Sequence, residues 1–579
     1  MDSVVVVING KEVESKKGTT ILEAAKSVGI KIPSLCHLEI PEIGYKNNCA
    51  SCRICIVEVI GRKNLVPACS TYISPGMVIN TNTMEVLEKR RNVLELMLSN
   101  HPTDCLVCAK NGNCDLQSLA MEFGIRDIRF QGKIFKYRRE VSPGIMRDLD
   151  KCIMCRRCET MCREIQTCEV LSAINRGFKS IVSTAFEKDL DKTSCTFCGQ
   201  CVAVCPVGAL YEKDYTWDIV RAISDKSKRV IVQVAPAVRV AIGEEFGFAP
   251  GEDVTGELIT GLRQLGFTDI FDTNFSADLT VMEEENELRE RLIKYIHGEE
   301  VKMPLMTSCC PGWVKFLENN YGEFKENLSS CKSPQQMFGA VIKNIWGPIR
   351  GINRKNIISV SIMPCLAKKM EGRIEEFSKD NNPDIDYSLT TRELAHLFKQ
   401  SNINLRHLSK GTFDKPLGAS SGAADIFGKT GGVMEAVLRT AYENITGIEL
   451  EDLDFKEVRG LEDTRIADVN IGGNKIKVAV VHGLGSARKL MEKIKNKEED
   501  IQVIEVMACK GGCVGGGGQP YHHGDFQVVK NRYIGLEKID EGKEFRKSHE
   551  NEDIKSLYEK YLEEPGSNLA KELLHRTYK

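Results

Sequence analysis

Cysteines at short, regular spacings are the residues of this sequence best suited to chemistry. Two runs, CIMCRRCETMC at 152–162 and CTFCGQCVAVC at 195–205, follow the pattern C-x2-C-x2-C-x3-C, and a proline follows the second. This spacing holds pairs of 4Fe–4S clusters, in which three cysteines of each run bind one cluster and the fourth crosses to the other. The runs therefore predict one cluster on Cys152, Cys155, Cys158 and Cys205, and a second on Cys195, Cys198, Cys201 and Cys162.

Zinc and disulfide bonds are the alternative explanations for so many thiols. Tetrahedral zinc sites use two C-x2-C pairs, whereas these runs are triples with an outlying fourth cysteine. The total of 23 cysteines is odd, and disulfide frameworks belong mainly to small secreted domains. Iron–sulfur ligation is therefore favoured.

An N-terminal group of cysteines predicts a 2Fe–2S cluster. The sequence VVVVINGKEVES indicates a hairpin with an Asn-Gly turn, and Thr20 with Glu23 forms a capping box that opens a helix. The strand-like IVEV follows Cys55 directly, as in related ferredoxin domains. The ligands favoured by this arrangement are Cys36, Cys52, Cys55 and Cys69, which leaves Cys49 as a spare thiol. The alternative is that Cys49 and Cys52 form the ligand pair.

The segment HPTDCLVCAKNGNC predicts a further cluster with one histidine ligand. His101 precedes a cysteine triplet that lacks a fourth ligand, and imidazole can replace thiolate on iron. A lone histidine is more often a capping or surface residue. The favoured ligands are His101, Cys105, Cys108 and Cys114.

Composition and charge exclude several classes of partner. Hydrophobic content is 42%, charged content 28% and formal net charge −2, which offers nothing to nucleic acid or to an anionic membrane. No apolar run approaches the length of a membrane span, and the apolar run after Met1 is too short for a signal peptide. We expect a cytoplasmic protein.

From about residue 215 the pattern changes to strand-like runs, RVIVQVAP, NIISVSIMP and IKVAVVHG, that alternate with charged helical stretches. VVHGLGSA lacks the G-x-G-x-x-G spacing, so no flavin or NAD site is expected. The tail should form two helices broken at Pro-Gly. The predicted domains of this multidomain α/β chain are 1–84 (β-grasp 2Fe–2S), 85–138 (helical His/Cys cluster), 139–214 (two 4Fe–4S clusters) and 215–579 (large α/β domain).

Three segments of the large domain, TSCCPGW (307–313), MPCLAKKMEGR (363–373) and EVMACKGGCVGGGGQP (505–520), resemble the signatures of the iron-only (FeFe) hydrogenases. The resemblance spans the whole chain and is that of modular clostridial-type enzymes. It implies an H-cluster, a 4Fe–4S cubane joined to a diiron unit with carbon monoxide, cyanide and a dithiolate amine. By match, its ligands are Cys310, Cys365, Cys509 and Cys513, and Cys513 also bridges to the diiron unit. The glycines beside Cys513 are expected to let the backbone close over this group.

The resemblance also assigns the pocket of the diiron unit. Lys368 matches a lysine that pairs with cyanide, and the alternative is an exposed lysine. The remaining pocket residues by match are Met363, Pro364, Met507, Ala235, Pro236, Ser333 and Gln335.

A proton relay follows from the same resemblance. Its residues are Cys309, Glu284, Ser329, Glu287 and Arg291. In MEEENELRER the charged members are spaced i, i+3, i+7 and share one helix face. The alternatives are a solvated acidic face and a buried inert cysteine.

Some positions depart from the family pattern, and their effect is left open: Ala237, Cys331, Asp425 and Lys429. No role is assigned to Cys168. The implied function is reversible conversion of protons and electrons to H2, with electrons relayed through the 2Fe–2S and 4Fe–4S clusters. The expected partners are soluble ferredoxin, possible NADH-linked electron-transfer subunits and dedicated maturation proteins, in an anaerobic host. Alternatives are an iron–sulfur assembly factor, a hydrogen sensor, and an NADH dehydrogenase subunit, which would explain only the first 214 residues.

Overall fold

The computed structural model describes residues 3–415 and 417–578 of the chain. These form two compact units, and each is described by itself. The first unit comprises Met1–Ile165, Glu169–Thr193 and Val204–Tyr211, and the second comprises Gln166–Cys168, Ser194–Ala203 and Glu212–Lys579. The short segment Ser194–Ala203 therefore belongs with the large second unit, although the chain around it belongs to the first.

The first unit begins with the predicted hairpin. Strands β1 (Ser3–Ile8) and β2 (Lys11–Lys16) pair antiparallel, and Asn9 and Gly10 both adopt positive φ, of 50° and 80°. A tight Asn-Gly turn requires this conformation. The capping box is also confirmed: Thr20 and Glu23 bond each other's backbone at the start of α1 (Ile21–Ser27).

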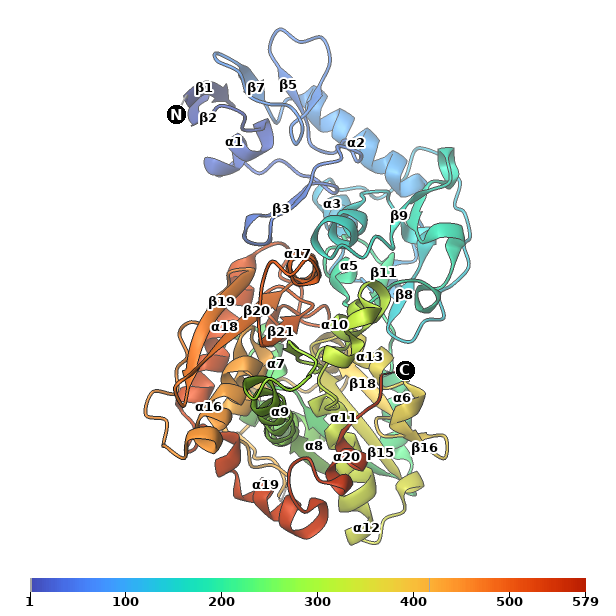
Figure 1. The fold of residues 1–579 in the computed structure, drawn as a ribbon. Helices are drawn as coiled ribbons and strands as arrows, with labels where there is room; N and C mark the ends of the chain where they lie inside the picture. Colours follow the sequence, from blue (N-terminus) through green and yellow to red (C-terminus); the bar gives the residue numbers. More distant parts are fainter. Residues whose placement is uncertain (1–2, 416, 579) are drawn as a thin grey trace. The chain divides into compact units, whose positions relative to one another are not determined.

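A mixed sheet carries the N-terminal cysteines. Its strands lie in the order β2-β1-β7-β5-β6 (Figure 1), and β5 begins directly after Cys55, as predicted. The strands that follow β1 and β2 in the chain are β3 (Leu38–Ile40), β4 (Tyr45–Asn47), β5 (Ile56–Val59), β6 (Val66–Pro67), β7 (Val78–Asn80), β8 (Ile145–Arg147), β9 (Ser172–Ile174), β10 (Ile181–Ser183) and β11 (Leu210–Glu212). The last residue of β11 already belongs to the second unit.

The expectation that residues 85–138 are helical is only partly correct. Helices α2 (Met84–Ser99) and α3 (Asp115–Glu122) are present, but residues 125–140 form neither helix nor strand. Gly124 ends the helical path with φ of 60°. The following chain is mostly exposed, and Arg129 bonds to Glu95 and Asn92 of α2. Without a buried face, a helix in this segment would gain little from packing.

Besides the short antiparallel pair β16 (Ser378–Lys379) and β17 (Asn382–Pro383), the described part of the second unit contains two four-stranded sheets. One is wholly parallel, in the order β13-β12-β15-β18, and the other has the order β14-β21-β20-β19, with only β19 antiparallel to its neighbour (Figure 1). The strands are β12 (Arg229–Val234), β13 (Asp269–Asp272), β14 (Leu305–Met306), β15 (Ile357–Met363), β18 (Tyr387–Thr390), β19 (Thr464–Ile471), β20 (Asn474–His482) and β21 (Val503–Met507). The three predicted strand-like runs correspond to β12, β15 and β20.

Helices cover these sheets and fill the space between them. The main ones are α6 (Thr216–Ser224), α7 (Pro236–Arg239), α8 (Thr255–Leu265), α9 (Thr273–Ile296), α10 (Pro311–Asn320), α11 (Pro334–Val341), α13 (Ala367–Glu371), α14 (Thr391–Gln400), α16 (Gly432–Thr446), α17 (Leu484–Lys495) and α18 (Phe526–Glu541). Helix α9 is almost entirely buried along its first four turns. The tail forms α19 (Glu552–Leu557), η17 (Tyr558–Leu562) and α20 (Asn568–Leu574), separated near Pro565-Gly566 as predicted.

The parallel strands direct their carboxyl ends toward one region. Ala235 and Pro236 follow β12, Pro364 and Cys365 follow β15, and the cysteines at 309 and 310 follow β14. The cysteines at 509 and 513 follow β21. Because parallel strands place their carboxyl ends at one edge, ligands of open α/β sheets bind there. The two sheets thus supply the loops of one site.

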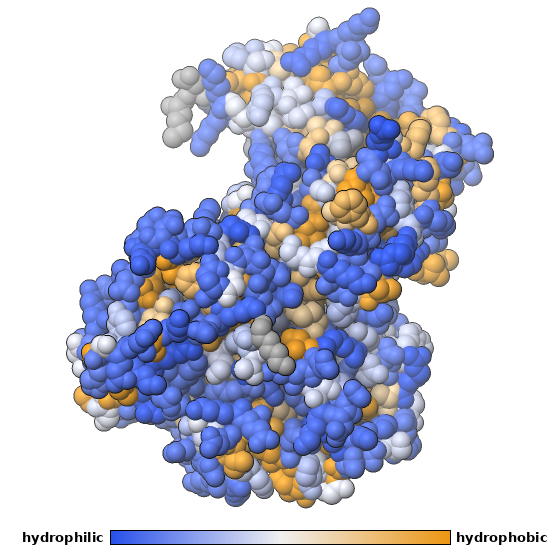
Figure 2. Space-filling view, turned by 45° about the vertical axis from the view of Figure 1, so that its right-hand side comes forward, coloured by the Kyte–Doolittle hydropathy of each residue, from blue (hydrophilic) through white to orange (hydrophobic). Residues whose placement is uncertain are grey.

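Hydrophilic residues dominate the face of the molecule in Figure 2, and hydrophobic residues lie in small separate patches. Within residues 3–415 and 417–578, no helix combines the length and apolar character needed to span a membrane.

Candidate metal centres and proton path

The cysteines predicted to hold a 2Fe–2S cluster come together in the first unit. Cys36, Cys52, Cys55 and Cys69 are all buried. The pKa of Cys36 is lowered by a hydrogen bond with the Cys49 thiol, and the thiols of Cys52 and Cys69 also act on it. Cys49 therefore lies beside the predicted ligands, and its Sγ bonds to the carbonyl of Cys155 at 3.1 Å.

His101 has the geometry of a ligand. Its Nδ1 lies 2.7 Å from the carbonyl oxygen of Pro102, while its buried Nε2 has no hydrogen-bond partner among the described residues. A hydrogen bond at Nδ1 fixes the tautomer that leaves Nε2 free to bind metal. Of the companion thiols, Cys108 contributes to the raised pKa of Cys114, for which burial is the main cause. This donor set fits a cluster.

The duplicated cysteine runs have the same backbone conformation. Met154 and Arg156 have φ of 54° and 62°, and the equivalent Phe197 and Gly199 have φ of 55° and 76°. In the first unit, Cys152 and Cys155 both lie close enough to Cys205 for its charge to raise their pKa, after burial as the main cause. Cys195, Cys198 and Cys201 belong to the second unit and Cys162 to the first, so this ligand set stays a prediction.

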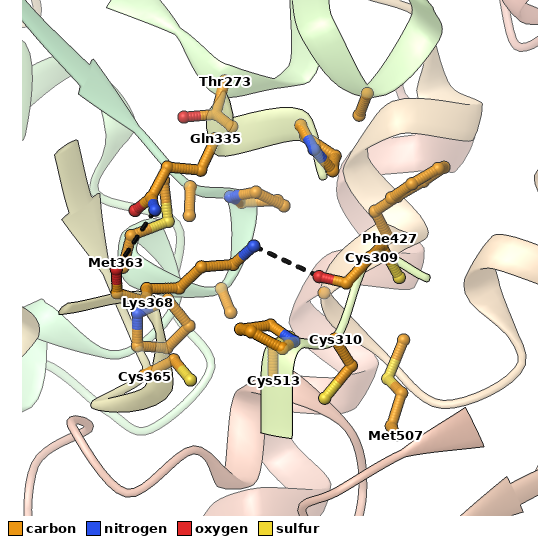
Figure 3. A pocket seen from close by; sticks show the side chains of 18 residues that line it. Thr273, Cys309, Cys310, Gln335, Met363, Cys365, Lys368, Phe427, Met507 and Cys513 are labelled. Carbon is orange, nitrogen blue, oxygen red and sulfur yellow. Dashed lines mark hydrogen bonds between the residues drawn. The ribbon is translucent and has the colours of Figure 1, made fainter. Parts of the chain in front are cut away.

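A cavity of about 80 Å³ lies at the carboxyl ends of the strands in the second unit (Figure 3). Its walls are mainly apolar, and Lys368 is the cation that reaches it. The sequence-predicted residues that line it are Ala235, Pro236, Cys309, Cys310, Gln335, Met363, Pro364, Cys365, Lys368, Met507 and Cys513. Ser333 does not line it, and neither does Cys509.

Cys509 nevertheless belongs to the same group of thiols. Burial raises its pKa, and the charges of Cys365, Cys198, Cys310 and Cys513 raise it further. In Figure 3 Cys310, Cys365 and Cys513 lie on the side of the cavity opposite Thr273 and Gln335. Burying several like thiols together is unfavourable for their ionised form, and iron bound by them would remove that penalty. The donor set fits a cubane.

Lys368 is held over the cavity by a buried carboxylate. Its Nζ lies 3.1 Å from the carbonyl oxygen of Cys309 and 3.1 Å from Glu371 Oε2. Burial alone would lower the pKa of Lys368, but the charges of Glu371 and Cys365 raise it on balance. The ammonium therefore stays charged. The alternative of an exposed lysine is wrong, because only 11% of this side chain is accessible.

Glu371 was missed by sequence reasoning. Its Oε2 accepts from Ser333 Oγ and from Gln335 Nε2, each at 2.9 Å. Ser333 therefore does not line the cavity but hydrogen bonds to Glu371, the residue that holds Lys368. The i, i+3 spacing of Lys368 and Glu371 in KKMEGR was the available signal. Other lining residues that were missed are Thr273, Ala277, Pro311, Pro334, Phe427 and Gly428.

The glycines beside Cys513 lie in close contact with other loops of the second unit. A Cβ on Gly516 would lie 2.3 Å from the carbonyl oxygen of Pro364, and one on Gly517 would lie 2.6 Å from Gly199 Cα. The run lets its backbone press against two other cysteine-bearing loops. The expectation that the glycines let the backbone close over a bound group stays a prediction.

The positions that depart from the family pattern have different environments. Ala237 lines the cavity. Asp425 pairs with Arg239 at 3.2 Å and with Lys543 at 3.3 Å, and burial raises its pKa to about 6. Lys429 pairs with Glu537 at 2.7 Å. Cys331 is buried beside Ser329, whose Oγ accepts its backbone N–H at 3.2 Å.

The predicted relay residues form a path leading from the cavity. The charge of Glu284 contributes to the raised pKa of Cys309, second to burial. Glu284 is buried, and neither carboxyl oxygen has a hydrogen-bond partner in the described part of the chain. Burial and then the charge of Glu287 raise its pKa to about 8, although the Ser308 amide and Ser329 hydroxyl oppose the rise. A cavity of about 10 Å³ borders Glu284, Ser329 and Thr307.

The outer part of the path is hydrogen bonded. Ser329 Oγ donates to Glu287 Oε2 at 3.0 Å, and Arg291 donates to Glu287 Oε1 at 2.6 Å. Glu287 and Arg291 line an open cleft of about 390 Å³. The shared helix face is confirmed, and the alternative of a wholly solvated face does not hold for the buried Glu284.

Sequence comparison matches each part of the chain to a known family. Residues 228–517 match the family described as iron only hydrogenase large subunit, C-terminal domain, and residues 526–579 match the iron hydrogenase small subunit. Residues 2–84 match a 2Fe-2S iron-sulfur cluster binding domain. Residues 90–129 match the iron-sulfur binding region of NADH-ubiquinone oxidoreductase-G, and 142–211 match the ferredoxin-like domain of NADH-quinone oxidoreductase subunit 3.

Individual relatives cover the chain from end to end. The NADP-reducing hydrogenase subunit HndD of Solidesulfovibrio fructosivorans is 53% identical over 580 residues, which cover 100% of this chain and 99% of that protein. Iron hydrogenase 1 of Clostridium pasteurianum is 42% identical over 580 residues, 99% of each chain. The solved structure of apo FeFe-hydrogenase HydA1 from Chlamydomonas reinhardtii, in a variant form, is 41% identical with a TM-score of 0.57, and covers 63% of this chain and 99% of that one. The cysteine-lined cavity, the accessory iron–sulfur domains and these relatives agree: the chain belongs to the iron-only (FeFe) hydrogenase family, as a modular member with accessory iron–sulfur clusters.

Proposed function

We propose that this protein is a reversible hydrogenase that moves protons through Cys309 and electrons through its accessory clusters. The observation that carries the proposal is the charged Lys368 ammonium, held by Glu371 at an apolar cavity that Cys310, Cys365 and Cys513 also line. Glu371 and the Cys309 carbonyl take up two of the three N–H donors of the Lys368 ammonium, so the third can be donated to an anionic group in the cavity. Cyanide on a diiron unit has that charge.

The chain holds the H-cluster by few covalent bonds and many contacts. Cys310, Cys365, Cys509 and Cys513 would bind the cubane, and Cys513 would also reach the diiron unit. Ala235, Pro236, Met363, Pro364 and Met507 would exclude water around it. When bound, the group supplies the redox centre at which two protons and two electrons combine to H2.

The chain's own residues would carry the protons. Cys309 would exchange a proton with the bound group at Sγ and with Glu284, whose pKa of about 8 suits proton transfer near neutral pH. The cavity between Glu284 and Ser329 is at the lower size limit for one water molecule. Such a water would connect Glu284 to Ser329, Glu287 and the open cleft.

Electrons would reach the cavity through the iron–sulfur clusters. We assign one 2Fe–2S and three accessory 4Fe–4S clusters to the ligand sets above, in domains 1–84, 85–138 and 139–214, with 215–579 catalytic. Cys198 acts electrostatically on Cys509 within the second unit, so the last accessory cluster would lie beside the cubane. Dedicated maturation proteins would assemble the diiron unit.

The electron partner follows from the accessory modules. The HndD relative is named as a subunit of an NADP-reducing hydrogenase, and two modules match NADH oxidoreductase families. We therefore propose that separate electron-transfer subunits associate with this chain, with soluble ferredoxin as a second carrier. Because ferredoxin could carry the electrons, hydrogenase activity with ferredoxin would persist in the absence of such subunits.

The test is the infrared spectrum of protein matured anaerobically, beside a known hydrogenase matured in the same cells. We expect bands of iron-bound carbon monoxide and cyanide, and their weakening in Lys368→Met. Lys369→Met is the matched control, because Lys369 is a neighbouring buried lysine whose Nζ bonds instead to Glu393 and the Ser388 carbonyl. Cys309→Ala should retain the bands and lose about 100-fold or more in turnover. Bands absent from the wild type, with iron–sulfur clusters present, would instead favour an assembly or electron-transfer protein.

A further inference from the structure

The C-terminal tail runs beside the proton path. Lys332 N–H donates to the carbonyl oxygen of Leu574 at 2.8 Å, and Arg576 N–H donates to that of Ser330 at 2.8 Å. Tyr578 OH donates to the carbonyl oxygen of Ser329 at 2.9 Å. These bonds fix the tail residues in register with Ser329 and Ser330.

This register places His575 between two carboxylates of α9. Its Nδ1 lies 2.7 Å from Ser330 Oγ, and its Nε2 lies 2.8 Å from Glu283 Oε2. Ser330 in turn bonds to Glu287 Oε2, through its N–H at 3.0 Å and its hydroxyl at 3.4 Å. A continuous hydrogen-bonded chain therefore runs from Glu287 through Ser330 to His575 and Glu283.

Arg291, the predicted end of the relay, cannot release a proton, because a guanidinium stays protonated in proteins. A proton that enters or leaves at Glu287 must use another group. Histidine is the side chain whose ordinary pKa lies near neutrality. His575 borders the same open cleft as Glu283 and Glu287.

We propose that His575 exchanges protons between the solvent-filled cleft and Glu287 through the Ser330 hydroxyl. This inference rests on the proposed proton path and extends it to the tail. For proton entry, the imidazolium gives its Nδ1 proton to Ser330 Oγ as the hydroxyl proton passes to Glu287. The neutral ring keeps its Nε2–H on Glu283, and water in the cleft returns a proton to Nδ1 once the hydroxyl has turned.

Both acidic and basic side chains surround His575. Glu283 and Glu287 face it from α9, Tyr558 of η17 donates to Glu283 at 2.5 Å, and Lys571 of α20 lines the cleft. The other charged residues around the cleft are Glu290, Arg291, Lys294, Glu300, Lys302 and Glu326.

The experiment compares matured wild type, His575→Gln and His549→Gln for H2 evolution across pH. His549 is a matched control, since it lies 2.8 Å from Glu443 and 3.3 Å from Thr440 Oγ1, away from Glu287. We expect about a tenfold loss in His575→Gln, with the infrared bands intact, and none in His549→Gln. Imidazole should restore turnover to His575→Gly in proportion to its concentration, which a purely structural role would not allow.

A second readout does not depend on activity. In protein labelled with ¹⁵N-histidine, the resonance missing from His575→Gln identifies the ring, and Ser330→Ala should shift it. An unshifted resonance would overturn the hydrogen-bonded chain. Wild-type rates in His575→Gln with a slow Glu287→Gln would overturn the inference and leave the proposed function standing. A wild type without infrared bands or turnover would instead count against the proposed function.

Discussion

Glu284 shows how one residue's surroundings can prepare it for proton transfer. Its carboxyl group is buried on α9 between Cys309 and Glu287, without a hydrogen-bond partner among the described residues. Burial disfavours the carboxylate, and the charge of Glu287 disfavours it further, so its pKa rises to about 8. At neutral pH the group therefore holds a proton, as the proposed relay requires.

This raised pKa predicts a pH-dependent effect of Glu284→Gln on stability. Glu284 has an ordinary pKa of about 4.5 and a native-state pKa of about 8. Between these two pH values, the native state holds a proton that the unfolded chain has lost. Stability from this group is therefore present at low pH and falls as pH rises through 8. Glutamine mimics the protonated acid, so the variant should gain relative to wild type by at most roughly 5 kcal/mol at about pH 9. Melting temperatures at about pH 5 and about pH 9 check this, and an equal difference at both would contradict it.

At the scale of elements, the site depends on strand ends and on the loops that follow them. Strands β12, β14, β15 and β21 each lead into a loop that lines the cavity. The glycine run after β21 packs against the loop after β15 and against the segment that carries Cys198, because its backbone lies against Pro364 and Gly199 without a side chain between them. In Figure 3 Cys310, Cys365 and Cys513, from the loops after β14, β15 and β21, lie on one side of the cavity.

Gly517→Ala should therefore displace the loop that carries Cys198. The new Cβ would lie 2.6 Å from Gly199 Cα and 2.7 Å from the Cys198 carbonyl oxygen, and backbone cannot yield as a side chain can. We expect a cost of about 1–3 kcal/mol and loss of iron from the cluster on Cys195, Cys198 and Cys201. Iron content and the melting temperature measure both effects. Gly322→Ala is the control, because no atom lies within 4 Å of its Cβ, and equal behaviour of the two variants would contradict the argument.

At the scale of the whole molecule, the compact units do not follow the order of the chain. Segment Ser194–Ala203 lies within the predicted ferredoxin domain but belongs to the second unit. Gln200 Nε2 donates to the carbonyl oxygen of Gly515 at 3.0 Å, and Asn319 donates to that of Ser194 at 3.1 Å. A segment of the predicted ferredoxin domain is thus built into the second unit.

Fragments of the chain should report this arrangement. A fragment of residues 194–579 retains these bonds, whereas one of residues 204–579 loses them and exposes Gly517. Each hydrogen bond contributes about 1 kcal/mol, so the shorter fragment should melt several degrees lower. Thermal unfolding of the two iron-free fragments is the measurement. Equal melting temperatures would show that the segment adds no stability to the catalytic unit.

Much of the site was predictable because its chemistry depends on the types of its residues and on their spacing along the chain. Cysteine spacing indicated which clusters to expect, the Asn-Gly pair predicted the first turn, and alternating apolar runs predicted β12, β15 and β20. Three local motifs identified the family. Each of these signals depends on residues that are neighbours along the chain, where geometry follows directly from covalent connection.

Only the tertiary structure decided which distant residues meet. Burial, not sequence, makes Lys368 a pocket residue, because the same KK pair could lie on a surface. Ser333 and Gln335 came to donate to Glu371, and His575 came close to Glu287, some 288 positions away, only after the strand ends and the tail had packed. The pKa of Glu284 depends likewise on how much water packing excludes, and no local pattern determines that. The sequence by itself thus determined the chemistry available to this protein, whereas packing decided which groups are buried, paired and able to transfer protons.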